Sequence, residues 1–266
     1  MSPPSKENVA QLLQALRQEF NNPQSNPDKC QDYLTQLKIQ LAELGLLDAL
    51  TADSQGLVLA RDVLEIGAYW SIRMKDIPSF ERYILQLAIF YQEGLRTQLP
   101  PSSSMYPLIG LNLLRLLSQS RVADFHTALE LIDPSELNRN PFIHHPLQLE
   151  QALMEGSYKR VWNSRTEVPA PEYTFFMDIL TLTIRNEIAS SCEKAYDSLP
   201  LEDAAALLFF SRPEEVQAFA QERGWRMNQI NRRVYFGNSE TDVQEFPIPK
   251  IVSQTLTYAQ ELEKIV

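Results

Sequence analysis

Histidine and cysteine are the residues best suited to bind a metal ion or to form a nucleophile–base pair, and this chain has few of them. It contains 3 histidines and 2 cysteines in 266 residues. His144 and His145 are adjacent and point in different directions, and no cysteine or third histidine lies near them to complete a zinc site. They precede Pro146, which favours an extended approach to the proline. Cys30 and Cys192 lack metal or redox spacing, so we expect two reduced thiols, buried or half-buried.

The remaining groups that could catalyse a reaction have structural explanations. The carboxylate pairs Glu202-Asp203 and Glu214-Glu215 fall at expected helix starts, where the helix dipole stabilises negative charge. His126, one residue after Phe125, suits a helix surface or the edge of the core. The chain contains no glycine-rich phosphate loop, no GxSxG nucleophile motif and no HExxH zinc motif. The sequence therefore predicts a protein that is not an enzyme and has no catalytic, metal or cofactor site.

Residues 185–238 have the element order of a winged helix, which is three short helices followed by a two-stranded hairpin. Ser211 and Glu214 have the spacing of a capping box at the start of the third helix, and Gly224 is a typical helix end. The second helix is expected at 201–209, and the two strands at 225–230 and 234–236.

The charge of this segment decides between nucleic acid and protein as its partner. A winged helix that reads duplex DNA needs a basic face, because phosphate neutralisation supplies most of the affinity. Residues 196–238 contain five arginines and six acidic residues, a net charge of −1, and the whole chain carries −10. We therefore expect a protein partner, no nucleic acid and no membrane, with winged-helix nucleic-acid binding as the alternative of another class. The arginines are Arg212, Arg223, Arg226, Arg232 and Arg233.

Residues 1–184 are expected to form a helical-repeat domain, so that the fold is mostly α. Apolar residues recur at helical spacing, and helices end in polar turns that lead to an aromatic residue. These aromatics, Phe80, Phe125 and Tyr158, are 45 and 33 residues apart. Such spacing is typical of a right-handed, tetratricopeptide-like stack of helical hairpins, in which each pair buries its apolar face on the next.

The two ends of the chain differ in character. The first residues lack the apolar core of a secretory signal, and no apolar run reaches the ~18 residues of a membrane span, so we expect a protein of the cytoplasm and nucleus. Residues 239–247 read as an acidic linker, and 248–266 as a C-terminal amphipathic helix. That helix can pack back on its own domain or on a helix of another chain.

Several stretches of the chain resemble a known family, the scaffold subunits that carry a PCI domain. That domain combines helical repeats with a winged helix, and it occurs in the proteasome lid, the signalosome and translation initiation factor three. The stretches are most similar to the lid subunits of the 26S proteasome regulatory particle, and the resemblance covers about residues 55–266. They are 62–72 with 75–83, 111–119 with 121–130, 145–158 with 173–180 and 184–189, and the ending 258–266.

The resemblance implies a non-catalytic lid subunit that acts in lid assembly and ubiquitin-dependent protein degradation. In that family, winged helices of neighbouring subunits pair in a horseshoe and C-terminal helices gather in a bundle. It implies as partners the other PCI lid subunits, notably non-ATPase subunit three, and the bundle of C-terminal helices, with a neighbouring ubiquitin receptor as a further candidate. The alternative is a scaffold of the signalosome or of initiation factor three.

Two sets of residues are candidates for these protein contacts. Val234, Tyr235 and Phe236 are expected on an exposed strand edge, which could extend the sheet of a neighbour. The second set is the apolar stripe of the terminal helix. It comprises Ile251, Leu256, Leu262, Ile265 and Val266.

Overall fold

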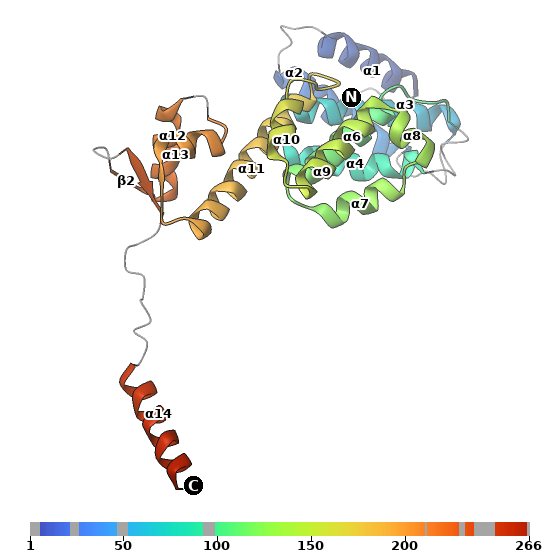
Figure 1. Cartoon of the computed structure of the whole chain (residues 1–266). Coiled ribbons are helices and arrows are strands. Elements are labelled where there is room, and N and C mark those ends of the chain that lie inside the picture. The colour runs from blue at the N-terminus through green and yellow to red at the C-terminus, as the bar shows by residue number, and fades with distance from the viewer. Residues whose placement is uncertain are drawn as a thin grey trace. The chain divides into compact units, whose positions relative to one another are not determined.

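The protein divides into two compact units, unit 1 (Met1–Ile184) and unit 2 (Arg185–Val266) (Figure 1). The computed structural model describes residues 6–21, 27–46, 53–92, 99–210, 212–228, 232–236 and 248–264. Within these ranges, no helix is long and apolar enough to cross a membrane.

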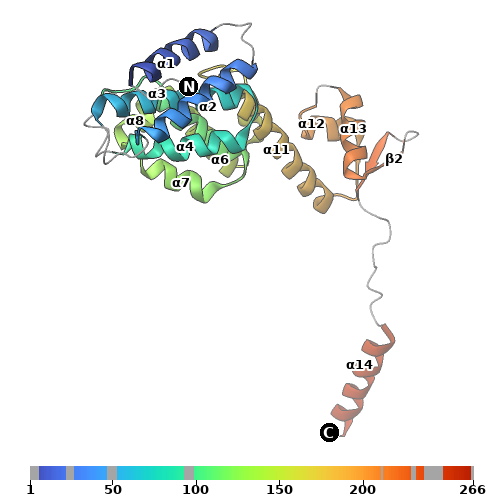
Figure 2. The same cartoon turned by 180° about the vertical axis from the view of Figure 1, so that it is seen from behind.

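Unit 1 is built of helices that pack side by side in pairs, so the predicted mostly α fold is confirmed. Helices α1 and α2 form one pair, α3 and α4 a second, and α6 packs on α9 (Figures 1 and 2). The helices are α1 (Lys6–Asn21), α2 (Pro27–Glu43), α3 (Ser54–Arg73), α4 (Ile77–Tyr91), α6 (Met105–Ser118), α7 (Val122–Glu130), α8 (Pro134–Arg139), α9 (Pro141–Met154) and α10 (Tyr158–Ser164). The first half of α11 (Tyr173–Ala195) completes the unit.

The recurring polar turns have a common backbone geometry. Lys75, Ser120 and Gly156 each follow a helix with a positive φ, of 59°, 57° and 69°. After each of them, the next N–H donates to a carbonyl five residues back, as from Asp76 to Ser71 at 2.8 Å. This left-handed cap ends one helix and starts the next within a few residues. The turn thereby delivers the aromatic that follows it to the core, and Phe80 and Phe125 are completely buried.

Helix α9 corrects the prediction of an extended approach to Pro146, because the helix continues through that residue. A proline inside a helix leaves the carbonyl four residues earlier without its N–H donor. Here that carbonyl belongs to Phe142, and the hydroxyl of Tyr173 on α11 lies 3.3 Å from its oxygen and 2.9 Å from that of Pro107. Gly110 on α6 lies directly against Phe142 O and Tyr173 Oη. Helices α6, α9 and α11 therefore approach one another closely at this point. Gly110 of α6 has no side chain there, and Pro146 of α9 has no backbone N–H to donate.

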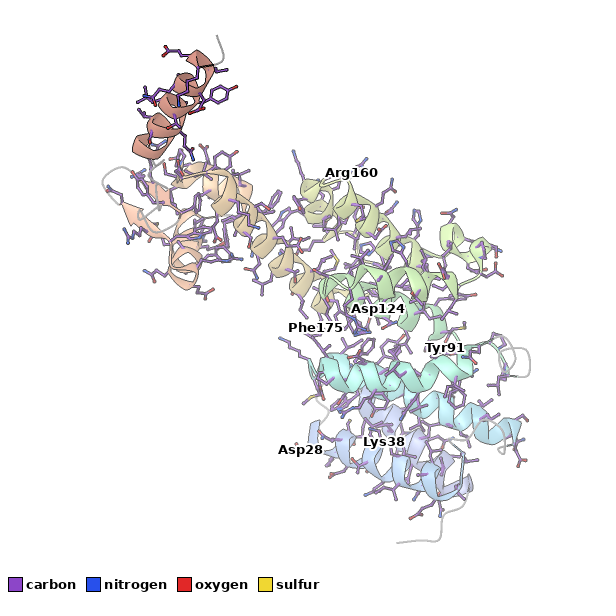
Figure 3. All side chains as sticks on the ribbon, turned by 90° about the horizontal axis from the view of Figure 1, so that it is seen from below. Asp28, Lys38, Tyr91, Asp124, Arg160 and Phe175 are labelled. Carbon is purple, nitrogen blue, oxygen red and sulfur yellow. The ribbon has the colours of Figure 1, made fainter. Side chains whose placement is uncertain are left out.

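The core of unit 1 is apolar and aromatic, and side chains fill the space between neighbouring helices (Figure 3). Phe80 of α4 packs on Phe176 of α11 with ring centroids 5.4 Å apart. The expected environment of the two thiols is confirmed, since Cys30 of this unit and Cys192 of unit 2 are both buried and neither is in a disulfide bond.

Unit 2 contains a small sheet with helices on it, in the element order of a winged helix. After the end of α11 come β1 (Ser198–Pro200), α12 (Leu201–Leu207), α13 (Pro213–Arg223), β2 (Arg226–Asn228) and β3 (Arg233–Tyr235). The strands are antiparallel in the order β1-β3-β2. Gly224 ends α13 with a φ of 73°, as predicted. The final helix is α14 (Ile248–Glu263).

Three details of unit 2 differ from the sequence prediction. The first helix is the end of α11, a helix of 23 residues that begins in unit 1. Strand β1 was not predicted, because it has three residues and ends in a proline. Helix α13 has Arg212 rather than Ser211 at its N-cap. Ser211 lies outside the described residues, as does the predicted acidic linker 239–247.

Candidate protein-interaction site

Each of the three histidines contacts a different neighbouring residue, and the three do not share one site. His126 Nε2 lies 3.4 Å from Glu150 Oε1, and His144 Nε2 lies 2.8 Å from the side-chain amide of Gln148. His145 is buried, and burial lowers its pKa. In the described parts of the chain, no group of three or more His, Cys, Asp or Glu side chains is placed to hold a metal ion.

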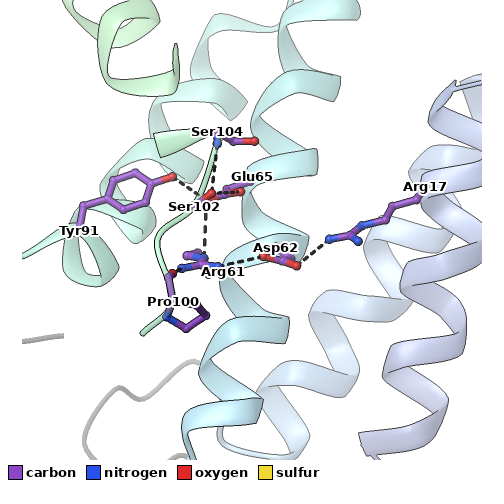
Figure 4. Close-up of polar contacts among 8 residues, drawn as sticks. All are labelled: Arg17, Arg61, Asp62, Glu65, Tyr91, Pro100, Ser102 and Ser104. Atoms are coloured by element: carbon purple, nitrogen blue, oxygen red, sulfur yellow. Dashed lines mark hydrogen bonds and ion pairs between the residues drawn. The ribbon is translucent and has the colours of Figure 1, made fainter. Parts of the chain in front are cut away.

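The most conspicuous polar cluster surrounds Glu65, a buried carboxylate of α3 (Figure 4). Tyr91 donates to Glu65 Oε1 at 3.0 Å, and Ser102 donates to Oε2 at 2.9 Å. The guanidinium of Arg61 donates to the carbonyl of Pro100 at 2.6 Å, and its Nε lies 3.7 Å from Glu65. Burial raises the pKa of Glu65, although these neighbours oppose the rise.

This cluster has a structural role. A cavity of about 190 Å³ adjoins it and is lined mainly by Tyr91, Pro100, Tyr106 and other apolar side chains. The carboxylate and the arginine are both occupied with the segment that enters α6. The network therefore ties that segment to α3 and α4.

In unit 2, arginines hold the end of α11 against the small helices. Arg185 donates to the carbonyls of Leu208 and Phe209, both at 3.1 Å, and its guanidinium lies 4.3 Å from the ring centroid of Phe210. Arg223 at the end of α13 donates to the carbonyl of Asn186 at 2.8 Å. These bonds cap the last turn of α12 and make the second half of α11, from Arg185 on, part of unit 2.

An aromatic row fixes the hairpin to the helices. Trp225 packs edge-on against Phe219 and Phe236, with ring centroids 5.7 and 4.8 Å apart. Its indole N–H donates to Glu193 Oε1 at 2.7 Å. Strands β2 and β3 are therefore anchored at one end by a packed tryptophan and a hydrogen bond to α11.

The predicted edge strand is in fact the centre of the sheet, so the basis for edge pairing through Val234–Phe236 was wrong. Strand β3 pairs with β1 on one side and β2 on the other. Val234 is fully buried and Phe236 is 8% exposed, whereas Tyr235 is 36% exposed. Of these three residues, Tyr235 alone presents its side chain to solvent, and the other two hold the strand in place.

Tyr235 lies on the outer face of the sheet, together with polar and basic residues. Side chains of directly opposed strand residues share one face of a sheet, and successive residues alternate between faces. Buried Val234 and its partners Leu199 and Met227 mark the inner face. The outer face, defined by the remaining pairs, consists of Ser198, Pro200, Arg226, Asn228, Arg233 and Tyr235.

Helix α14 has an exposed apolar stripe, as the sequence predicted for an amphipathic helix. Val252, Leu256, Tyr258 and Leu262 are 48%, 60%, 68% and 48% exposed. The side chain of Ile251 lies outside the described part of the chain, as do Ile265 and Val266. A stripe of this kind on an α-helix fits a groove or a bundle of helices.

Comparison with known proteins identifies relatives of nearly the same length. Residues 103–245 match the profile of the CSN8/PSMD8/EIF3K family. The chain is 36% identical over 269 residues to the 26S proteasome non-ATPase regulatory subunit 8 homolog A of Arabidopsis thaliana, covering 99% of each protein. It is 37% identical to the 26S proteasome regulatory subunit rpn12 of Schizosaccharomyces pombe, over 89% of this chain and 93% of that protein.

The Saccharomyces cerevisiae protein 26S proteasome regulatory subunit RPN12 is 33% identical over 97% of this chain and 99% of its own length. The similarity thus extends over both units rather than over one shared domain.

Proposed function

Because the chain belongs to the CSN8/PSMD8/EIF3K family, we propose that it is a non-catalytic subunit of the 26S proteasome regulatory particle, the counterpart of subunit 8 or Rpn12. The observation that carries the proposal is similarity along almost the whole chain to three proteins with those names. In this role the protein is a PCI scaffold of the lid, in the cytoplasm and nucleus, and it serves ubiquitin-dependent protein degradation through contacts.

Two surfaces would make those contacts. Unit 2 would meet a neighbouring PCI subunit, such as non-ATPase subunit three, through the part of the sheet that carries Tyr235. Helix α14 would enter a bundle of lid C-terminal helices through its apolar stripe. Contact with a nearby ubiquitin receptor would be a further part of this role. The stripe includes Ile251, Leu256, Leu262, Ile265 and Val266.

The exposed stripe makes α14 more important for assembly than for folding. Complete burial of one large aliphatic side chain contributes ~1.5–3 kcal/mol, and the loss of rigid-body and side-chain freedom on association offsets a large part of the sum. Leu256 and Leu262 are 60% and 48% exposed, so about half of that gain is still available to a partner.

The experiment is to add the full-length chain, or a variant, to lid particles that lack this subunit. A chain that ends at Phe246 should keep its thermal unfolding temperature and lose incorporation. The substitutions Leu256→Asp and Leu262→Asp together should have the same effect. As a matched control, Gln254→Asp and Gln260→Asp place the same two charges on the polar face and should incorporate normally. Normal incorporation of the truncated chain would refute the role of α14.

The family is named for CSN8 and EIF3K as well as for PSMD8, and PCI domains also occur in the signalosome and in initiation factor three. A PCI scaffold of either complex is therefore the second candidate function. Affinity purification of the native chain followed by mass spectrometry separates the candidates, because each predicts a different set of co-purified subunits. Recovery of signalosome or initiation-factor subunits without proteasome subunits would contradict the proposal.

A further inference from the structure

We propose that the outer face of the sheet in unit 2 is a basic docking site for a carboxylate-rich surface of a neighbouring protein subunit. The inference rests on the proposed function as a scaffold, and it specifies which face of unit 2 is used and what chemistry the partner must offer. It differs from pairing of strand edges, because the contact is made by side chains on the face of the sheet.

The pleat of the three strands assembles this face. Arg226 of β2 lies directly opposite Tyr235 of β3, and Arg233 of β3 lies opposite Asn228 of β2. Ser198 of β1 lies beside Tyr235 on its other side. The two arginines therefore sit diagonally on neighbouring strands, next to a tyrosine that is 36% exposed.

The turn between β2 and β3 adds a third positive charge next to the face. Arg232 is exposed and has a φ of 46°, and its carbonyl accepts a hydrogen bond from Leu201 N–H at 2.8 Å. That bond holds the backbone of Arg232 against the start of α12. Among the described residues, neither Arg232 nor Arg233 forms an ion pair with an acidic side chain.

Charge is segregated within unit 2, which contains nine basic and thirteen acidic residues and therefore has a net charge of −4. Residues 224–236 contain three arginines and no acidic residue, on a chain with a net charge of −10. Exposed acidic residues lie outside the sheet face, with Asp197 directly before β1, Glu202 and Asp203 on α12, and Glu215 and Glu222 on α13. The described residues of the sheet face include two arginines and no carboxylate, so the face is a positive patch that a negatively charged partner complements.

The size of the patch favours an acidic protein over a nucleic acid. Three strands at about 4.8 Å spacing span roughly 10 Å. Duplex DNA carries one negative charge per ~1.7 Å, and tight binding takes roughly 6–10 phosphate contacts. Three arginines cannot provide these, and the carboxylates of α13 would oppose phosphates at the helix that usually enters the groove. Two or three carboxylates on a protein surface match the patch.

The composition of the face also fits a protein contact. Arginine and tyrosine are the residues most enriched where side-chain truncation weakens protein interfaces. A guanidinium binds a carboxylate through two parallel hydrogen bonds, and the ring of Tyr235 offers apolar area beside that pair. The arrangement would give both attraction at long range and a defined docking orientation.

The test measures binding of the full-length chain to lid particles that lack this subunit, at several salt concentrations. The principal variant is Arg226→Glu with Arg233→Glu. Its matched control is Lys194→Glu with Arg212→Glu, which makes the same change in net charge at exposed positions of unit 2 outside the sheet. A second variant, Arg226→Lys with Arg233→Lys, keeps both charges, and circular dichroism reports whether each variant is folded.

We expect the double glutamate variant to bind roughly tenfold or more weakly at 0.15 M salt and to lose most of the salt dependence of the wild type. The control should bind as the wild type does, and the lysine variant should lie between the two. Equal binding by the wild type and the glutamate variant would overturn the inference, as would an equal loss in the control.

Two further outcomes are distinguishable from these. Failure of the wild type itself to join the particles would refute the proposed function, and the inference with it. Binding of the wild type to a 20-base-pair DNA duplex at 0.15 M salt, abolished by the glutamate variant while particle binding is unchanged, would assign the face to nucleic acid and overturn the inference.

Discussion

A single methyl group at Gly110 should measure how closely the helices of unit 1 are packed. An alanine Cβ there would overlap both the carbonyl oxygen of Phe142 on α9 and the hydroxyl of Tyr173 on α11. Both contacts would fall well inside the 3.0 Å that real Cβ atoms keep. One obstacle is backbone, and the other is a buried hydroxyl held by two carbonyls, so neither can move aside cheaply.

The sign of the effect follows from three contributions. In an open helix, glycine to alanine would stabilise the protein by ~0.8–1 kcal/mol through helix propensity. Against this, overpacking costs ~1–3 kcal/mol. Weakening the buried hydrogen bonds of Tyr173 costs ~1–3 kcal/mol more. We therefore expect Gly110→Ala to lower the free energy of unfolding by about 2–4 kcal/mol.

Urea unfolding followed by circular dichroism measures this change, and hydrogen exchange in α6 and α9 locates it. Gly156→Ala is the control, because that glycine has a φ of 69° with open space around it. Its cost of ~1–2 kcal/mol should come from the backbone alone. Tyr173→Phe combined with Gly110→Ala removes one of the two overlapping atoms, so the pair should be less destabilising than the sum by ~0.5 kcal/mol or more.

The reasoning is refuted if Gly110→Ala is as stable as the wild type, or if its effect and that of Tyr173→Phe simply add. Either result would mean that α6 can move away from α9 and α11 without cost. The meeting point of the three helices would then not be a close-packed contact.

Two other substitutions test polar contacts that fix each unit. Burial raises the folded-state pKa of Glu65, so the folded protein holds this proton more tightly than the unfolded chain does. Stability should therefore fall as pH rises from 4.5 through the folded-state pKa, and Glu65→Gln should flatten this part of a curve of urea midpoint against pH. Trp225→Phe keeps a ring in the aromatic row but removes the N–H that donates to Glu193. It should cost about 1 kcal/mol in urea unfolding, at the low end for a charged acceptor because that carboxylate is 33% exposed; no loss would mean that the bond does not anchor the hairpin.

Local signals in the sequence were enough to predict the helices and their turns. The polar turn before each aromatic was visible, and the structure gives its physical reason in the left-handed cap at Lys75, Ser120 and Gly156. Such a cap depends only on a few consecutive residues, so the sequence contains the information needed to find it. The stripe of α14 was predictable for the same reason, since helical periodicity is also a local property.

Two of the wrong predictions depended on residues far apart in the chain. The helix continues through Pro146 because Tyr173, 27 residues later, supplies a donor that the proline lacks. Strand β3 is central because Ser198–Pro200 returns to pair with it. A short strand that contains a proline gives almost no local signal, so neither β1 nor the position of β3 could be read before the register was known.

The pairing of the strands also changes how the charge of unit 2 must be judged. The charges of residues 196–238 sum to −1, and this sum alone indicates no charged face. In a strand, however, alternate residues lie on opposite faces of the sheet, and the acidic residues of α12 and α13 lie on those helices and not on the sheet. Once Val234 is known to point inward, Arg233 and Tyr235 must point outward, and Arg226 must join them. The net charge argues against a DNA reader, but it conceals a basic face that the alternation of residues along the strands reveals. A search for the partner should therefore start from the positive charge of this face, which the net charge of residues 196–238 does not predict.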